Sequence, residues 1–141
     1  MTQVTLDTSK GQLVAYAFGQ DAVAASQDNV QIPAVGPEEG GTTAGYTMPF
    51  KGDIVAIAVE LTAAGSAGTL TVGATADGTE DADTTMTITT GTGHYKRIPR
   101  GKARIAAGAE LGCEITSDGS WNGTTADMNA VVYVLHYLEG I

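Results

Sequence analysis

The feature that most constrains the fold is an alternation of apolar side chains, which is clearest in residues 53–61. Two alternating sets make up this segment: Val55, Ile57, Val59 and Leu61 in one, and Ile54, Ala56, Ala58 and Glu60 in the other. A period of two is that of a β-strand, whose successive side chains point to opposite faces. We therefore expect a strand with the first set in the core and the second set half-exposed or against a neighbouring element.

Short segments of the same kind, separated by turns rich in Gly and Thr, follow to the end of the chain. The expected strands are residues 13–18, 29–32, 53–61, 70–76, 85–89, 94–98, 110–116 and 130–138. The one candidate for a helix, in residues 126–138, contains the run Val-Val-Tyr-Val, which is too β-branched and aromatic for a helix. Many short strands at regular spacing indicate an all-β protein, a sandwich or barrel, of which we expect the antiparallel β-sandwich.

The length and composition fit one such domain. A chain of 141 residues corresponds to a single domain, and 43% apolar residues exclude wholesale disorder. Aromatic residues make up only 6%, so the core is expected to consist of Val, Ile, Leu and Ala. Sandwiches with so thin a core often gain stability by oligomerising, which buries more surface. We divide the chain into a short polar N-terminal arm, residues 1–12, and a single β-sandwich domain, residues 13–141.

The charge of the chain is strongly negative. Sixteen acidic residues against seven basic ones give a net charge of −9. This balance argues against binding to nucleic acid or to an anionic membrane surface, both of which require a basic surface. No apolar run approaches the ~20 residues of a membrane span, and no signal peptide opens the sequence. We therefore expect a protein that is made and folds in a cytoplasm.

We find no catalytic constellation, so the sequence predicts no catalytic residue, no cofactor and no metal ligand, and we do not expect an enzyme. Cys113 is the single cysteine, and its place on the face of Leu111 and Ile115 predicts a buried, inert thiol. The two histidines lack metal-binding spacing, and His136 is expected to pack with a polar tip. The acidic turn 77–83 departs from the helix–loop–helix calcium pattern. A looser calcium site there stays open, beside the simpler alternative of a solvated hairpin tip.

The basic residues are concentrated in one stretch. Five of the seven lie within nine positions, and they are Lys96, Arg97, Arg100, Lys102 and Arg104. This stretch is either a solvated surface strand with its loop or a docking patch for an acidic surface. As a docking patch it would take an acidic partner protein or a neighbouring copy of the chain, with residues 77–83 as a plausible contact.

The last expected strand is apolar on both faces. Val131, Tyr133, Leu135 and Tyr137 point one way, and Val132, Val134, His136 and Leu138 point the other way. Both faces should therefore be covered, one of them by the core. The other face is covered either by a second sheet or a loop of the same chain, or by another subunit. Tyrosine is favoured at subunit interfaces. If this face is a subunit interface, we expect Tyr133, Leu135 and Tyr137 to form it.

Over residues 13–138, the chain resembles the jelly-roll head decoration and head-fibre proteins of tailed bacteriophages. The resemblance rests on turn and strand patterns in residues 45–49 (Gly-Tyr-Thr-Met-Pro), 51–55 (Lys-Gly-Asp-Ile-Val), 68–72 (Gly-Thr-Leu-Thr-Val), 107–108 (Ala-Gly) and 130–134 (Ala-Val-Val-Tyr-Val). Similar layouts occur in the tips of phage tail fibres and in other trimeric jelly rolls.

The resemblance implies that the β-sandwich is of the jelly-roll type and that the chain is a non-enzymatic structural protein of the virion. Such a protein would be made in the host cytoplasm and would cement the outer surface of the capsid as a homotrimer, with the major capsid protein as its partner. It also implies that the arm contacts the shell, and the arm residues in question are Thr2, Gln3, Val4, Thr5 and Leu6. The alternative is a receptor- or glycan-binding tip of a fibre or adhesin. The scarcity of aromatic residues argues against that alternative, for which Trp121 is the best candidate for a sugar platform.

Overall fold

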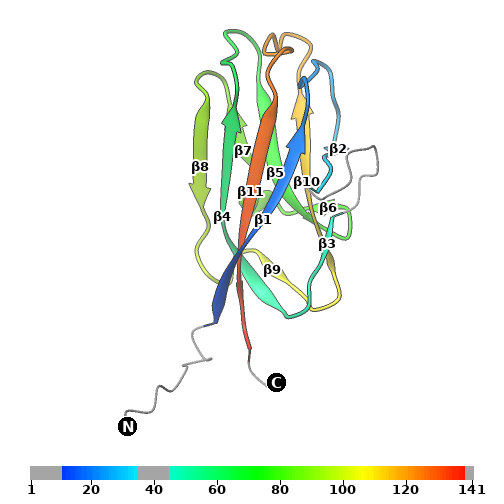
Figure 1. The fold of residues 1–141 in the computed structure, drawn as a ribbon, viewed down its shortest axis with the longest axis vertical. Coiled ribbons are helices and arrows are strands. Elements are labelled where there is room, and N and C mark those ends of the chain that lie inside the picture. Colours follow the sequence, from blue (N-terminus) through cyan, green and yellow to red (C-terminus); the bar gives the residue numbers. More distant parts are fainter. Residues whose placement is uncertain (1–10, 35–44, 139–141) are drawn as a thin grey trace.

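The protein is a sandwich of two antiparallel β-sheets, as a computed structural model that describes residues 11–34 and 45–138 shows (Figure 1). The strands are β1 (Gln12–Gln20), β2 (Val30–Gln31), β3 (Tyr46–Thr47), β4 (Gly52–Leu61), β5 (Leu70–Ala76), β6 (Thr79–Glu80), β7 (Met86–Ile88), β8 (Gly93–Arg97), β9 (Arg104–Ile105), β10 (Glu110–Ser117) and β11 (Met128–His136). A single turn of 3₁₀ helix, η2 (Ala82–Thr84), is the helical element of the described residues, which contain no helix long and apolar enough to cross a membrane.

The order of the strands is that of a jelly roll. Sheet A has the order β1-β11-β4-β8, with β9 also paired to β4. Sheet B has the order β2-β10-β5-β6, with β3 paired to β10 and β7 paired to β5. The first strand pairs with the last, and the chain crosses repeatedly from one sheet to the other, which is the double Greek-key connection of a jelly roll. The expected fold class is therefore confirmed.

The core lies between the two sheets and is built by the alternation that the sequence shows. Strand β10 contributes Leu111, Cys113 and Ile115, all fully buried, so Cys113 lies where its pattern predicted. Strand β11 contributes Val132 and Val134 from its inner face. The aromatic content of the core is small, as expected, and a core of aliphatic side chains packs the two sheets together.

One part of the alternation in β4 is shifted. Ile57, Val59 and Leu61 are buried as predicted, but Val55 is only half-buried, and Ile54 is buried in its place. The cause is an irregularity in the pairing with β11, where Ala56 lies opposite Tyr133 and Ile54 lies opposite Val134. Val55 is the extra residue of a β-bulge, which reverses the sense of the alternation for the residues before it.

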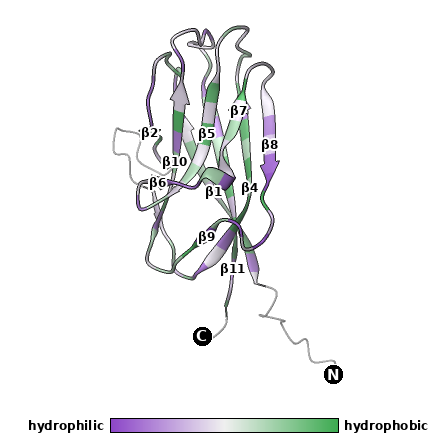
Figure 2. Cartoon of the chain, turned by 180° about the vertical axis from the view of Figure 1, so that it is seen from behind, coloured by the Kyte–Doolittle hydropathy of each residue, from purple (hydrophilic) through white to green (hydrophobic). Residues whose placement is uncertain are grey.

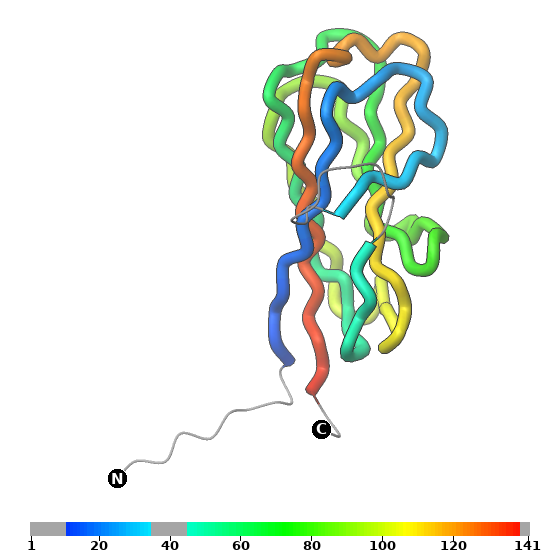
Figure 3. Tube along the Cα trace, turned by 45° about the vertical axis from the view of Figure 1, so that its right-hand side comes forward, coloured from blue at the N-terminus to red at the C-terminus, as the bar shows by residue number. Residues whose placement is uncertain are grey.

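Strands β1 and β11 lie side by side over their full lengths, and Gln12 is the partner of His136 (Figure 3). The start of β1 and the end of β11 therefore lie at the same end of the sandwich. Residues 1–10 lie outside the described residues, so the predicted arm and its boundary stay predictions, although Gln12 belongs to β1. Inside this end, His136 is buried, with the Tyr16 hydroxyl 2.7 Å from its Nε2 and the Phe50 carbonyl oxygen 2.9 Å from its Nδ1. The expected packing of His136, with a bonded polar tip, is what the structure has.

Candidate functional site

The candidate site is the outer face of sheet A, which points away from the core. Its side chains follow from the register of the four strands. They are Leu13, Ala15 and Ala17 of β1, Val131, Tyr133 and Leu135 of β11, Ala56 and Ala58 of β4, and Tyr95 and Arg97 of β8. Leu13 is the partner of Leu135, and Tyr133 lies between Ala15 and Ala56. We call this set the outer face.

The outer face is apolar and exposed. Leu13 is 59% exposed and Tyr95 is 71% exposed, and they are the large hydrophobic residues that the described part of the chain leaves exposed. Between them lie the alanines of β1 and β4 and the larger Val131, Tyr133 and Leu135 of β11. Contact of this face with another protein surface would be favourable, because it would remove this apolar area from water.

Of the three residues predicted for a trimer interface, two lie on the outer face. Tyr133 and Leu135 are half-buried there. Tyr137 follows the end of β11, and its hydroxyl is engaged within the chain: it donates to Asp53 Oδ2. The structure thus brings Tyr133 and Leu135 together with Leu13, while Tyr137 forms a separate polar cluster at one end of the face.

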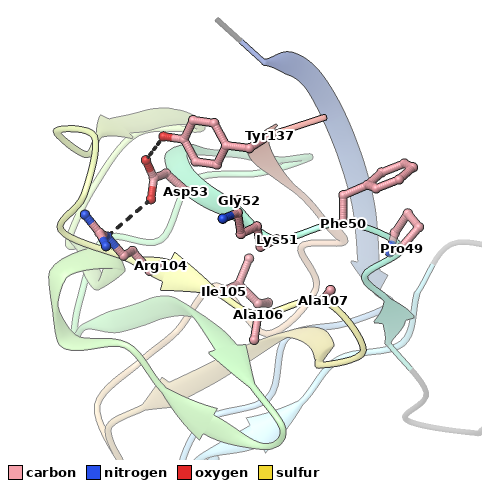
Figure 4. Close-up of a pocket in the computed structure, with 10 residues that line it drawn as sticks. All are labelled: Pro49, Phe50, Lys51, Gly52, Asp53, Arg104, Ile105, Ala106, Ala107 and Tyr137. Carbon is pink, nitrogen blue, oxygen red and sulfur yellow. Dashed lines mark hydrogen bonds and ion pairs between the residues drawn. The ribbon is translucent and has the colours of Figure 1, made fainter. Parts of the chain in front are cut away.

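This polar cluster joins Tyr137 and Asp53 to two arginines, of which Figure 4 shows Arg104. Arg100 donates from Nε and Nη2 to the Tyr137 hydroxyl oxygen at 3.3 and 3.1 Å, and its guanidinium lies 5.3 Å from the centre of the Tyr137 ring. Asp53 is buried, and Arg104 Nε lies 4.0 Å from its Oδ1. Asp53 thus offsets part of the positive charge of the arginines, and Tyr137 is held in one position.

A groove lies beside this cluster, with a volume of about 840 Å³ (Figure 4). It is lined by Pro49, Phe50, Lys51, Gly52, Asp53, Arg104, Ile105, Ala106, Ala107 and Tyr137. Lys51 and Arg104 supply positive charge, and the remaining lining is largely apolar or already hydrogen-bonded. Within this lining, the Tyr137 hydroxyl is already bonded to the Asp53 carboxylate.

The five basic residues of the predicted docking patch do not all lie on the same side of sheet A. Arg97, Arg100, Lys102 and Arg104 are exposed, and Arg97 lies on the outer face with its guanidinium 5.9 Å from the centre of the Tyr95 ring. Lys96 belongs to the opposite face of β8, because it is the partner of the buried Ile57, and its Nζ donates to the carbonyl oxygen of Thr85 at 3.0 Å. Figure 2 shows the hydrophilic character of β8 that these residues produce. Arg97 therefore lies on the outer face, Arg100 and Arg104 belong to the polar cluster at its end, and Lys96 connects β8 to Thr85, just before β7.

The other candidate groups are used inside the fold. Asp77 accepts the backbone N–H of Glu110, and Asp81 accepts the N–H of Asp83 as the N-cap of η2. Within residues 11–34 and 45–138, no three His, Cys, Asp or Glu side chains gather in a way that could hold a metal ion. Burial raises the pKa of the Cys113 thiol well above its ordinary value, which keeps the sulfur protonated and unreactive.

Trp121, the residue considered for a sugar platform, is buried at one end of the sandwich. Its Nε1 donates to the Val23 carbonyl oxygen at 3.1 Å, and Gly65 and Gly123 leave space for its ring. The exposed aromatic ring is that of Tyr95 instead. Sequence reasoning missed Leu13 and Tyr95 as members of one surface, because only the pairing of β1 and β8 on either side of β11 and β4 places them on the same face.

Comparison with known proteins finds no match in sequence and a weak likeness in structure. No protein-family model matches the chain, and no curated protein matches it in sequence. Among solved structures, the chain is similar to one titled "Sacbrood virus of honeybee - expansion state II", with a TM-score of 0.41 and 9% sequence identity, over 99% of this chain and 86% of that one. A likeness this weak assigns no function.

Proposed function

We propose that the chain is a non-enzymatic structural protein of a virion, a decoration protein that binds the outer surface of a capsid as a homotrimer and stabilises the head. The major capsid protein would be its partner and the host cytoplasm its place of synthesis. The proposal joins the jelly-roll topology to the resemblance to phage decoration proteins in the turn and strand patterns of residues 13–138. The trimeric state comes from that resemblance alone.

One observation carries the proposal. The large exposed hydrophobic side chains of the described residues, Leu13 and Tyr95, share one face of one sheet with Tyr133 and Leu135. An apolar sheet face that spans four strands is costly to leave in water, and covering it with a second copy of the chain would stabilise both copies. The arginines at its border would meet the acidic surface of a neighbouring copy, since the chain as a whole carries a charge of −9.

The arm would supply the contact with the shell. It precedes β1, whose first residue, Gln12, is paired with the last residue of β11, His136, at one end of the sandwich. In a trimer the three arms would leave from three copies of this end. One short polar arm binds weakly, but three arms on one particle act at high effective concentration, so avidity can rise by ~10²–10⁴. Binding to the assembled shell alone would stabilise that shell by linkage.

The alternative, a receptor- or glycan-binding tip, would have to use Tyr95. Trp121 is buried and offers no face to a sugar, whereas Tyr95 is exposed and has Arg97 beside its ring. This use of Tyr95 competes with burial of the outer face in a trimer, so the oligomeric state separates the two functions.

The proposal is tested by sedimenting the purified protein with and without capsids that lack it. A variant without residues 1–11 retains every strand of the sandwich and should stay folded and oligomeric, but it should remain in the supernatant while the full chain pellets with the capsids. Thr87→Glu, on the exposed outer side of sheet B, serves as a control and should pellet like the full chain. Equal decoration by the shortened and full chains would refute the role of the arm, and no decoration by the full chain would refute the capsid partner.

A further inference from the structure

Sheet B carries a buried carboxyl group on its outer side. Glu114 of β10 is 5% exposed, although its side chain points away from the core that Cys113 and Ile115 face. On its two neighbouring strands, its register partners are Gly73 of β5 and Gln31 of β2. An acidic side chain so deeply covered requires a specific partner, because burial disfavours its ionised form.

The partner is a second carboxyl group. Glu80 of β6 reaches over β5 at Gly73, which is paired with Glu114, so the two carboxyl groups lie close enough to interact. The missing side chain of Gly73 makes this possible, since a Cβ at that position would lie 2.7 Å from Glu80 Oε1 and 2.9 Å from its Cδ. The Thr85 hydroxyl, beyond η2, donates to Glu80 Oε1. The pair therefore connects the segment of β6 and η2 to the centre of sheet B.

The remaining groups around the pair are neutral or negative. Gln31 Nε2 donates to Glu114 Oε2 at 3.1 Å, and the Thr75 hydroxyl donates to Gln31 Oε1 at 3.1 Å. Asp28, just before β2, adds negative charge. Lys96, the cation of β8 on this side, donates its N–H to the Thr85 carbonyl oxygen and forms no ion pair with either glutamate within the described residues.

Two hydrogen-bonded carboxyl groups without a cation are stable when they share one proton. The protonated group then donates its O–H to the ionised one, whereas two ionised groups repel each other and lack a donor. The pKa of Glu114 is raised to about 7, chiefly by burial and then by the hydrogen bond and charge of Glu80.

We propose that Glu80 and Glu114 form a proton-dependent clamp, which fastens the segment of residues 79–85 to sheet B and weakens when the pair loses its shared proton. The segment also carries Asp81 and Asp83, so ionisation of the pair adds to its negative charge. The segment is also attached by the pairing of β6 with β5 and by the buried Thr84, whose hydroxyl accepts the Ala74 N–H at 2.9 Å. The carboxyl pair is the attachment that depends on pH.

The direction of the pH effect follows from linkage. The folded chain holds a proton on Glu114 up to about pH 7, while the unfolded chain releases it near pH 4.5. The stabilisation is therefore complete below pH 4.5 and is lost as the pH rises through 7. In this window the folding equilibrium constant falls by at most about tenfold for each pH unit.

Glu114→Gln tests the clamp because glutamine imitates the protonated acid. Its amide N–H can donate to Glu80 at every pH, and its carbonyl oxygen can accept from Gln31. The clamp should contribute to a fall in the thermal midpoint of the wild type between pH 4.5 and 8. We expect Glu114→Gln to lack this contribution and to have a higher thermal midpoint than the wild type at pH 8. The matched control is Glu110→Gln, an exposed glutamate on the same strand, which should keep the wild-type profile.

Parallel profiles of the wild type and Glu114→Gln would overturn the clamp. A second measurement decides the matter if that variant does not fold: titration of the Glu114 carboxyl carbon by NMR in the wild type should have a midpoint near pH 7, and a midpoint below pH 5 would overturn the clamp. Gly73→Ala should lower this midpoint, because its methyl group displaces Glu80 from Glu114, and an unchanged midpoint would exclude Glu80 as the partner.

Discussion

Ile54 of β4 and Val134 of β11 lie opposite each other and both point into the core, because Val55 is the extra residue of a β-bulge between them and the next pair, Ala56 and Tyr133. The bulge sets which side chains of β11 reach the outer face and which reach the core. It also lets Asp53, just before Ile54, point outward, where Tyr137 and Arg104 meet it.

The bulge predicts unequal costs for two neighbouring truncations. Ile54→Ala should lower the free energy of unfolding by about 2–5 kcal/mol, because it opens a cavity between the sheets. Val55→Ala should cost about 1 kcal/mol or less, since Val55 is half-buried and removes less apolar area from water. Denaturant unfolding of both variants measures the difference, and a larger loss for Val55→Ala would contradict the observed register.

Cys113 is predicted to be inert while the protein is folded. Its side chain is fully buried and its pKa is raised by burial, so a thiol reagent should label it only as fast as the chain unfolds. Cys113→Ser should cost about 1–3 kcal/mol, because it places a hydroxyl without a partner in the core. Rapid labelling under native conditions would show that β10 opens far more readily than its burial indicates.

The hydroxyl of Tyr137 is predicted to stabilise the fold by satisfying Asp53. Tyr137→Phe should cost about 1–3 kcal/mol, since it leaves a buried carboxylate with Arg104 as its remaining partner, 4.0 Å away. Tyr133→Phe is the matched control, because the Tyr133 hydroxyl makes no hydrogen bond within the described residues, and it should change stability little. Equal effects of the two substitutions would show that the Asp53 contact contributes nothing.

The sequence alone predicted the structure where the prediction depended on a local pattern of residues. The alternation in β10 and β11 predicted Leu111, Cys113, Val132 and Val134 as core residues, and the spacing of the strands predicted a β-sandwich, whose jelly-roll type came from the resemblance. The bulge at Val55 could not be foreseen, because it depends on the pairing of β4 with β11. A strand position alone does not show which side chains will meet across the sheet.

The outer face and the site of Glu80 and Glu114 also depend on which strands pair with each other. Leu13 and Tyr95 are 82 positions apart in the sequence (95 − 13) and share a face only through β11 and β4. Glu114 lies on the side of its strand opposite Cys113, and Glu80 and Gln31 from two other strands cover it. Local patterns carry no information on such contacts between distant segments.

The assignment of the outer face as a subunit interface is tested most directly by the mass of the purified protein in solution, measured by sedimentation equilibrium at micromolar concentration. We expect the wild type to be a trimer, and Thr87→Glu on sheet B to leave it so. Tyr133→Asp should give a folded monomer, because it would bury an unpaired charge between copies, and the pair Leu13→Ser with Tyr95→Ser should weaken association through loss of apolar area. A wild-type protein that is monomeric, or variants that associate as the wild type does, would contradict the account.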